Sequence, residues 1–246
     1  MPKPLSILAG ILLSGCMQTH AQQPAADPVT ANTPAVAGAI MVFHQSAGLQ
    51  SQLYNGRTHI GYPPNMLGSA YYLSNDAQLG AVEYDHILFE QVPLWYDEVR
   101  EKLVVRHFNV VSTFELWSER VSRFWIGTHP FIRLVQQTGN TAHAPATGFY
   151  EVLASGKLDL LARRKKLLTD VIENLEVKKR VENNESFFAR MNGTYYSVNN
   201  QRSLLSLIND KKKQVQQYMK KNGWKFRRDP ENYLIKAVTY YNQSTS

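Results

Sequence analysis

The sequence has a single cysteine, Cys16, among its 246 residues. One cysteine cannot form an internal disulfide, so packing and hydrogen bonds must hold the fold together. The apolar run near the N-terminus, Leu5 to Leu13, is too short to cross a bilayer as a permanent helix. The sequence therefore predicts neither a disulfide-stapled domain nor a helical membrane anchor.

Familiar catalytic and metal-binding motifs are also absent. The sequence contains no Gly-x-Ser-x-Gly elbow and no glycine-rich phosphate loop ending in Lys-Ser or Lys-Thr. Its histidines form no His-x-His or His-Glu-x-x-His arrangement, so a zinc site and a bound cofactor have no support. Six histidines follow the N-terminal segment, and we interpret them as turn or surface residues: His44, His59, His86, His107, His129 and His143.

The N-terminus has the features of an export signal. Lys3 precedes the apolar run Leu5 to Leu13, and Leu13-Ser14-Gly15-Cys16 resembles the lipobox of bacterial lipoproteins, in which the cysteine becomes the lipidated first residue. Cleavage after Ala21 is the alternative, and it would release a soluble protein. We favour lipidation of Cys16. The prediction is a periplasmic or outer-membrane lipoprotein, or alternatively a secreted soluble protein.

The chain divides into three segments by composition. Residues 1–21 are the export signal, and residues 22–39 are rich in Ala, Pro and Thr, which predicts a disordered tether. Residues 40–246 are long enough for a single domain. A tether between a lipid anchor and a folded domain suits a protein that is held at a membrane.

The middle of the chain predicts an antiparallel meander. The segment Gly80 to Arg106 is rich in β-branched and aromatic residues, with turn positions at Asp85-His86 and Tyr96 to Glu98. Pro93 places its strand at a sheet edge or beside a bulge. Further short strands and hairpins are expected at 40–43, around Asn55-Gly56, at 71–73, 110–116, 123–127, 131–135, 149–153, 157–163, 187–190 and 194–198. Residues 165–181 have helical apolar spacing but remain ambiguous.

The C-terminal third predicts helices instead. Residues 201–208 read as a short helix, and Asp210 is expected to cap a second helix that ends at Gly223. Asp229 followed by Pro230 predicts the start of a third helix. The predicted fold class is therefore α+β: a curved antiparallel β-meander or half-barrel, followed by two or three short C-terminal helices.

Several of these positions together resemble a known family. They are Leu53-Tyr54-Asn55-Gly56, Gly80 to Asp85, Val92 to Asp97, Gly148 to Gly156 and Leu204 to Lys212. The pattern is similar to a family of exported bacterial β-rich proteins, many of them lipoproteins, with no assigned activity. The resemblance spans roughly Leu53 to Asn242 and rests on turn and strand positions. It implies a fold and a compartment but no chemistry.

Charge is distributed unevenly along the chain. Residues 1–150 carry a net charge of −2, and residues 151–246 carry +9, for a total of +7. Two runs make up the candidate basic surface: Arg163, Arg164, Lys165 and Lys166 in the first, and Lys211, Lys212 and Lys213 in the second. An exported protein is not expected to bind nucleic acid, so the runs indicate either a solvated face or attraction to an anionic envelope component.

Three functions remain open from the sequence. The first is a non-enzymatic binding or accessory protein of the cell envelope. The second is an envelope hydrolase that uses carboxylates near Asp85 and Asp97. It requires two or more of five residues to converge in one cleft: Glu83, Asp85, His86, Asp97 and His107. The third is a carrier of an apolar ligand, which requires an apolar cavity of about 300 Å³ or more. The sequence favours the first.

Overall fold

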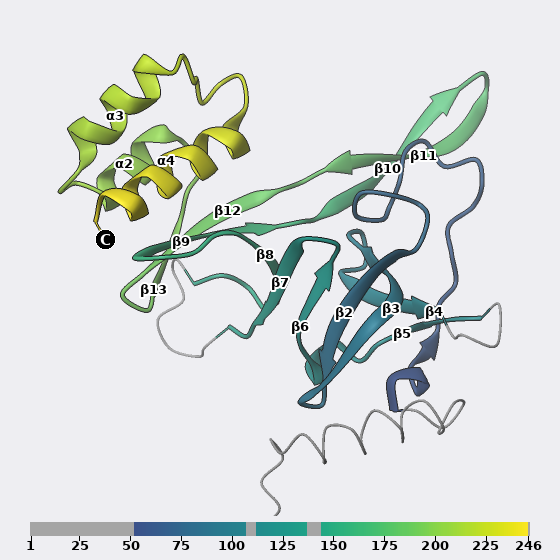
Figure 1. Ribbon diagram of the computed structural model, residues 1–246. Helices are drawn as coiled ribbons and strands as arrows, with labels where there is room; N and C mark the ends of the chain where they lie inside the picture. Colours follow the sequence, from purple (N-terminus) through teal and green to yellow (C-terminus); the bar gives the residue numbers. More distant parts are fainter. Residues whose placement is uncertain (1–51, 107–111, 137–143, 246) are drawn as a thin grey trace, which may run out of the picture. The chain divides into compact units, whose positions relative to one another are not determined.

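The computed structural model describes residues 52–106, 112–136 and 144–245, which all belong to the compact unit Ala47–Ser246 (Figure 1). The predicted strand at 40–43 and Cys16 lie outside the described residues. Strands dominate the first part of the unit, and helices follow at its C-terminal end. The α+β fold class is therefore confirmed. None of the helices in the described ranges is both long and apolar enough to cross a lipid bilayer.

The strands form one large open sheet and one separate hairpin. The large sheet has eleven antiparallel strands in the order β1-β5-β4-β3-β2-β6-β7-β8-β9-β12-β13, and β10 pairs only with β11 (Figure 1). The strands are β1 (Arg57–Thr58), β2 (Gln78–Tyr84), β3 (Ile87–Asp97), β4 (Lys102–Arg106), β5 (Thr113–Glu115), β6 (Val121–Ile126), β7 (His129–Leu134), β8 (Gly148–Ala154), β9 (Leu158–Arg163), β10 (Lys166–Glu173), β11 (Glu176–Asn183), β12 (Ser186–Met191) and β13 (Thr194–Ser197).

The predicted meander is present as β2, β3 and β4. Asp85 and His86 both adopt positive φ, at 49° and 65°, as a tight two-residue hairpin turn requires. Pro93 pairs with Leu79 of β2, but the pairing of β3 with β4 begins only at Leu94. The β2–β3 register also shifts between Gly80 and Val82. Pro93, which has no amide hydrogen to donate, therefore lies beside a bulge, and no β4 residue is paired with Pro93.

The structure corrects one predicted hairpin and resolves one ambiguous segment. Asn55-Gly56 does not form a hairpin: it links the short 3-10 helix η2 (Gln52–Tyr54) to β1, and a Cβ on Gly56 would lie 2.1 Å from the carbonyl oxygen of Glu115. Gly56 is therefore required by the close approach of β5 rather than by a turn. Residues 165–181, whose spacing suggested a helix, belong to the β10–β11 hairpin. Its turn, Asn174-Leu175, lacks the glycine that would have signalled it.

Aromatic side chains fill the core on one face of the large sheet. The rings of Phe124 and Phe131, on neighbouring strands, stack with centroids 4.6 Å apart. Tyr96 lies 5.4 Å from each of them, and Phe149 lies 5.2 Å from Phe124. All four rings are fully buried. Inward-facing residues on β3, β6, β7 and β8 therefore form one aromatic cluster.

Three helices cover the other end of the sheet. They are α2 (Gln201–Leu207), α3 (Lys212–Lys221) and α4 (Pro230–Ser244). Leu204, Val215 and Val238 are fully buried in a second apolar cluster with Leu160 of β9 and Ala189 of β12. The buried residues of α4 lie on one face of the helix, which packs against β8 and β9, and α3 packs against α4.

The ends of the helices follow the predicted signals with one exception. Asp229 caps α4, since its carboxylate accepts a hydrogen bond of 3.0 Å from the backbone amide of Asn232. Gly223 ends α3 with a φ of +70°. Asp210, however, does not cap α3: the N-cap is Lys211, without a side-chain hydrogen bond. Asp210 instead lies 3.6 Å from Lys157 and accepts a hydrogen bond from Tyr241.

Candidate functional site

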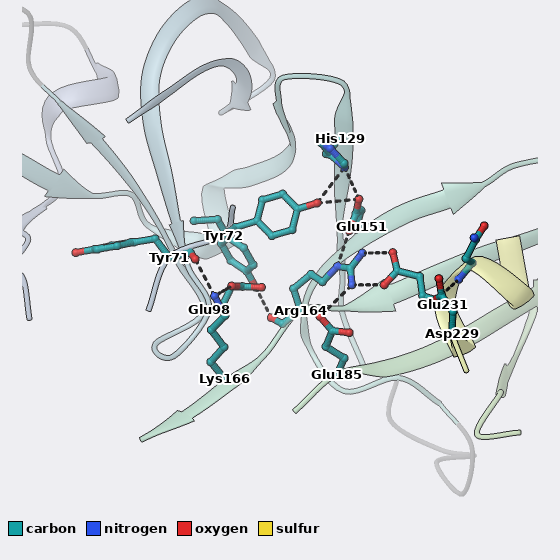
Figure 2. A network of polar contacts seen from close by, with 12 residues as sticks. Tyr71, Tyr72, Glu98, His129, Glu151, Arg164, Lys166, Glu185, Asp229 and Glu231 are labelled. Carbon is teal, nitrogen blue, oxygen red and sulfur yellow. Dashed lines mark hydrogen bonds and ion pairs between the residues drawn. The ribbon is translucent and has the colours of Figure 1, made fainter. Parts of the chain in front are cut away.

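A network of charged side chains joins the sheet, the β10–β11 hairpin and the helices (Figure 2). Its centre is Arg164, in the link between β9 and β10, whose side chain is 7% exposed. The guanidinium donates to Glu151 of β8 at 2.5 Å, and to both carboxylate oxygens of Glu231, in the first turn of α4, at 2.7 and 2.8 Å. It also lies 3.1 Å from Glu185, between β11 and β12. One cation therefore fixes three separate parts of the fold.

Glu151 continues the network toward the surface. Its Oε1 atom accepts a hydrogen bond of 3.0 Å from the hydroxyl of Tyr72 and lies 2.7 Å from Nδ1 of His129 (Figure 2). The His129 side chain is 39% exposed, whereas that of Glu151 is 3% exposed. The sequence predicted His129 to be a turn or surface residue. It lies at the start of β7 and is half-exposed, but it also contacts a buried carboxylate.

A second ion pair, between Lys166 and Glu98, lies at the start of β10. The Nζ atom of Lys166 lies 2.5 Å from Oε2 of Glu98 and donates to the carbonyl of Tyr71 at 2.8 Å. The backbone amide of Lys166 donates to the carbonyl of Glu98 at 3.0 Å. These contacts fasten the start of β10 to the turn between β3 and β4.

Burial and charge perturb the proton affinities of these groups. Burial raises the pKa of Glu98, and Lys166 offsets part of that rise. Burial also raises the pKa of the Tyr72 hydroxyl, and the adjacent Glu151 raises it further. Burial alone would lower the pKa of Arg164, but Glu231 and Glu151 raise it above its ordinary value. Tyr72 thus stays protonated as a donor and Arg164 stays charged, which suits a structural tie.

The first predicted basic run is therefore not an open basic surface. Arg163 donates to Glu101 at 2.7 and 3.0 Å, and Lys165 lies 3.4 Å from the same carboxylate. With Arg164 and Lys166 paired as described, all four cations of the run have carboxylate partners. The sequence could not show this, because the partners lie on β8, on α4 and in the β3–β4 turn.

The second predicted run has a different environment. Lys212 and Lys213, in the first turn of α3, are exposed, and Lys211 is half-exposed. The same helix ends in exposed Lys220 and Lys221. Exposed cations continue into the connection to α4: Lys225, Arg227 and Arg228. Among the described residues, no carboxylate lies within ion-pair distance of any of these side chains. We call this set, Lys211–Lys213, Lys220, Lys221, Lys225, Arg227 and Arg228, the basic helical surface.

This surface accounts for the charge of the whole protein. Residues 201–246 contain ten Lys and Arg against three Asp and Glu, a net charge of +7, which equals the net charge of the chain. The two lysines at the start of α3 also oppose the helix dipole, whose N-terminal end favours acidic residues, and the first turn contains none. Helix stability therefore does not explain why this end is basic.

The structure does not bring the predicted hydrolase carboxylates together. Asp85 and Asp97 lie at opposite ends of β3, an eleven-residue strand, so roughly 30 Å separates them. Asp97 is fully buried and accepts hydrogen bonds from the backbone amides of Val99 and Arg100, at 3.0 and 2.9 Å, and from the Tyr62 hydroxyl at 2.9 Å. It stabilises the β3–β4 turn.

The remaining candidates of that cluster do not form a catalytic pair. Asp85 receives a hydrogen bond of 2.8 Å from Arg120, and this contact lowers the pKa of the carboxyl group. Glu83 is paired with Arg123. Asp85 and the exposed His86 line a shallow depression of about 310 Å³ together with Arg120 and other residues. His107 and the histidines at positions 44 and 143 lie outside the described residues.

His59 has a partner set that the sequence did not reveal. Its Nδ1 atom lies 3.0 Å from Oε1 of Glu115, and its Nε2 atom lies 2.8 Å from the hydroxyl of Tyr71. The imidazole is buried, not on the surface as predicted. Burial raises the pKa of Tyr71, with Asp97 adding to the rise. A phenol that holds its proton more tightly is a poor nucleophile, so this arrangement ties residues 59–71 to β5 rather than activating a group.

Other hollows on the described part of the chain are open rather than enclosed. One, of about 380 Å³, lies over β2, β3 and β6 and is lined by Leu79, Leu88, Trp125, Glu90 and Gln91 among others. Its mixed polar and apolar lining differs from the enclosed apolar cavity that a carrier requires. Within the described ranges no group of three or more His, Asp or Glu side chains is arranged to hold a metal ion.

Comparison with protein-family models, with curated proteins and with solved structures finds no match to this chain.

Proposed function

We propose that this protein is a non-enzymatic binding or accessory protein of the cell envelope, and that it holds an anionic envelope component on the basic helical surface. The observation that supports this most strongly is the contrast between the two basic runs. The cations of residues 163–166 are matched by carboxylates, whereas those of α3 and the α3–α4 connection are exposed without one in the described part of the chain.

Physical reasoning supports a ligand with several negative charges. A single surface ion pair contributes at most about 1 kcal/mol, because water and salt screen it. Several cations on one surface can contact a polymer or an array of anionic groups together, which raises the avidity without any strong single contact. Trp224 lies beside this surface, half-buried, with Lys236 placed 5.8 Å over its ring. This provides a flat apolar element for a ligand with sugar or acyl components.

The test is salt-dependent binding to a polyanion probe. Heparin is immobilised, and the protein is eluted with increasing NaCl. The variant Lys212→Gln/Lys213→Gln is compared with Lys165→Gln/Lys178→Gln, which removes the same two charges from lysines that lie 3.4 and 3.5 Å from carboxylates.

We expect the first variant to elute at distinctly lower salt and the second to elute close to the wild-type protein. Equal shifts in the two variants would mean that only net charge matters, and the basic helical surface would then not be a binding site.

The proposed location depends on the N-terminal segment. We propose that Cys16 is lipidated and that the chain belongs with the exported β-rich lipoproteins that it resembles. The pattern Leu13-Ser14-Gly15-Cys16 supports this assignment. Mass spectrometry of the mature N-terminus from membrane and soluble fractions tests it. A diacylglyceryl-modified Cys16 is the expected result, and an unmodified N-terminus at Gln22 would exclude the anchor.

We also propose that the large sheet curves as a half-barrel. The strands β3 and β8 are separated by β2, β6 and β7 in the sheet order, so in a flat sheet they would be about 19 Å apart. The rings of Tyr96 and Phe149 on these strands are nevertheless 6.0 Å apart, and Glu101 of the β3–β4 turn contacts Arg163 of β9. Both contacts support a curved sheet.

A further inference from the structure

The end of the β10–β11 hairpin exposes an unusual group of apolar side chains. Ile172, Leu175 and Val177 are 78%, 99% and 67% exposed. Ile172 and Val177 lie directly opposite each other in the ladder, so they share one face, and Leu175 occupies the turn beyond them. We call these three residues the hairpin tip. Neither strand of this hairpin contains a buried residue, so the tip does not belong to a core.

The backbone at Leu175 is also unfavourable for leucine. The turn residues Asn174 and Leu175 have φ values of 53° and 66°. The β12–β13 hairpin has the same kind of turn, and there Asn192 is followed by Gly193, with φ values of 51° and 78°. Glycine adopts this left-handed conformation without strain, whereas leucine does not. Leu175 is therefore disfavoured both by its exposure and by its conformation. An exposed residue in a strained conformation is an observation from which a functional hypothesis can be drawn.

Charged side chains behind the tip neutralise one another. Asp170 pairs with Lys179 at 2.7 Å, and Glu173 lies 3.2 Å from Arg180 and 3.5 Å from Lys178. Residues 166–183 contain four basic and four acidic residues. The tip is thus an apolar end on a neutral stem, which suits the uncharged interior of a lipid layer better than an anionic surface.

We propose that the hairpin tip inserts into the acyl-chain region of a lipid bilayer. Insertion would remove Ile172, Leu175 and Val177 from water together, which is the main driving force for interfacial binding. Glu173 and Glu176 lie opposite each other in the ladder. Because side chains alternate along a strand, both point to the opposite face from Ile172 and Val177. A hairpin that enters at a slant can therefore bury its apolar face while both carboxylates stay among the headgroups.

This inference rests on the proposed envelope location. The chain between Cys16 and Gln52 can span at most about 120 Å, so a domain tethered to a lipidated Cys16 has its hairpin within reach of the same membrane. A diacylglyceryl group on Cys16 supplies two acyl chains, which anchor the chain stably by themselves. The tip would therefore hold the domain against the bilayer surface rather than provide the attachment.

The base of the same hairpin face is covered, unlike its tip. Leu67 donates its amide to the carbonyl of Lys179 at 2.8 Å, and a Cβ on Gly68 would lie 3.3 Å from Val181. The segment around Leu67 and Gly68 therefore holds the base of the hairpin in place. A substitution at the tip is consequently not expected to disturb the rest of the fold.

The test uses vesicles of phosphatidylcholine, which carry no net charge, in high salt, so that the basic helical surface does not contribute. All proteins carry Cys16→Ser, so that no acyl anchor is present and the contribution of the N-terminal segment is the same in each. Leu175→Asn is the main variant, because asparagine accepts the left-handed conformation and leaves the turn intact. Leu79→Asn is the matched control, since Leu79 is 60% exposed on β2.

We expect Leu175→Asn to lower the partition coefficient by about tenfold or more, and Leu79→Asn to leave it unchanged. In a second measurement, the fluorescence of Leu175→Trp should shift to the blue on adding vesicles and should be quenched by brominated acyl chains. Equal partitioning of the Leu175→Asn variant and the wild-type protein, or an indole in the Leu175→Trp variant that stays in water, would overturn the proposal.

The Leu175→Asn variant would also reveal whether the hairpin tip binds protein instead of lipid. If Leu175→Asn abolished self-association in sedimentation velocity and left vesicle binding unaltered, the tip would bind a second copy of the chain, and the lipid proposal would be refuted. The vesicle result does not depend on heparin elution or on the mature N-terminus. A failure of the lipid proposal is therefore distinguishable from a failure of the proposed function.

Discussion

Replacing Arg164 by methionine tests whether the charged network holds the fold together. The substitution keeps an unbranched side chain of similar reach but removes the only arginine or lysine in contact with Glu151 among the described residues. The Glu151 side chain is 3% exposed, so its charge would be left in a poorly solvated site. Breaking a buried ion pair in this way costs about 3 to 5 kcal/mol. Because Tyr72 and His129 still contact Glu151, we expect a loss near the lower limit, about 3 kcal/mol.

The control and the double variant separate the causes. Arg190→Met removes an arginine that is 43% exposed and paired with Asp159, and it should cost at most about 1 kcal/mol. Adding Glu151→Gln to Arg164→Met removes the stranded charge and should recover part of the lost stability. Urea unfolding at neutral pH measures all four proteins. The reasoning is refuted if Arg164→Met costs no more than Arg190→Met, or if the double variant is less stable than the single one.

Three further substitutions probe separate features. Burial raises the folded-state pKa of Glu98 above its ordinary value of 4.5, so its contribution to stability is present below that pH and is lost as pH rises. In urea titrations, the stability of the wild-type protein relative to Glu98→Gln should therefore fall as the pH rises above 4.5, and an increase would contradict this. Gly80→Ala should lower the free energy of unfolding by about 3 kcal/mol or more, because a Cβ would lie 1.9 Å from the Trp125 carbonyl oxygen. An unchanged melting temperature would show instead that β2 and β6 can move apart to accept the methyl group. The buried Tyr233 hydroxyl has no hydrogen-bond partner among the described residues. Tyr233→Phe should therefore leave the melting temperature unchanged or raise it slightly. A clear decrease in melting temperature would show that the hydroxyl does have a partner.

Local signals in the sequence predicted most of the elements and few of their partners. The Asp85-His86 turn, the turn between the predicted strands 187–190 and 194–198, and the Asp229-Pro230 cap depend on signals within a few residues. The structure has each of them where the sequence placed it. The β10–β11 hairpin was missed because Asn174-Leu175 is a poor turn sequence, and helical spacing of its leucines competed with it. Apolar periodicity cannot settle such a segment when no residue in it is buried.

The candidate site shows why side-chain pairing was less predictable than secondary structure. Arg164 meets Glu151, Glu185 and Glu231, which lie 13 to 67 residues away along the chain. Before folding, Arg164 and Lys212 look alike: each is a cation in a basic run. Only the tertiary arrangement shows that one neutralises buried carboxylates while the other faces solvent. The cations of the first basic run are thus paired within the fold, and Lys212 and Lys213 of the second are exposed.

Three residues on the two surfaces proposed to bind run against the local preferences for stability. Lys212 and Lys213 stand at the helix end that repels cations, and Leu175 stands in a turn that favours glycine, fully exposed. Other positions of the chain have the preferred residue, such as Asp229 at a helix start and Gly193 in a turn, while Leu73 and His86 also adopt positive φ. Exceptions of this kind are expected where a sequence serves binding as well as folding. It follows that Lys212→Gln/Lys213→Gln and Leu175→Asn should each weaken binding without lowering the free energy of unfolding, a combination that a purely structural role for these residues would not produce.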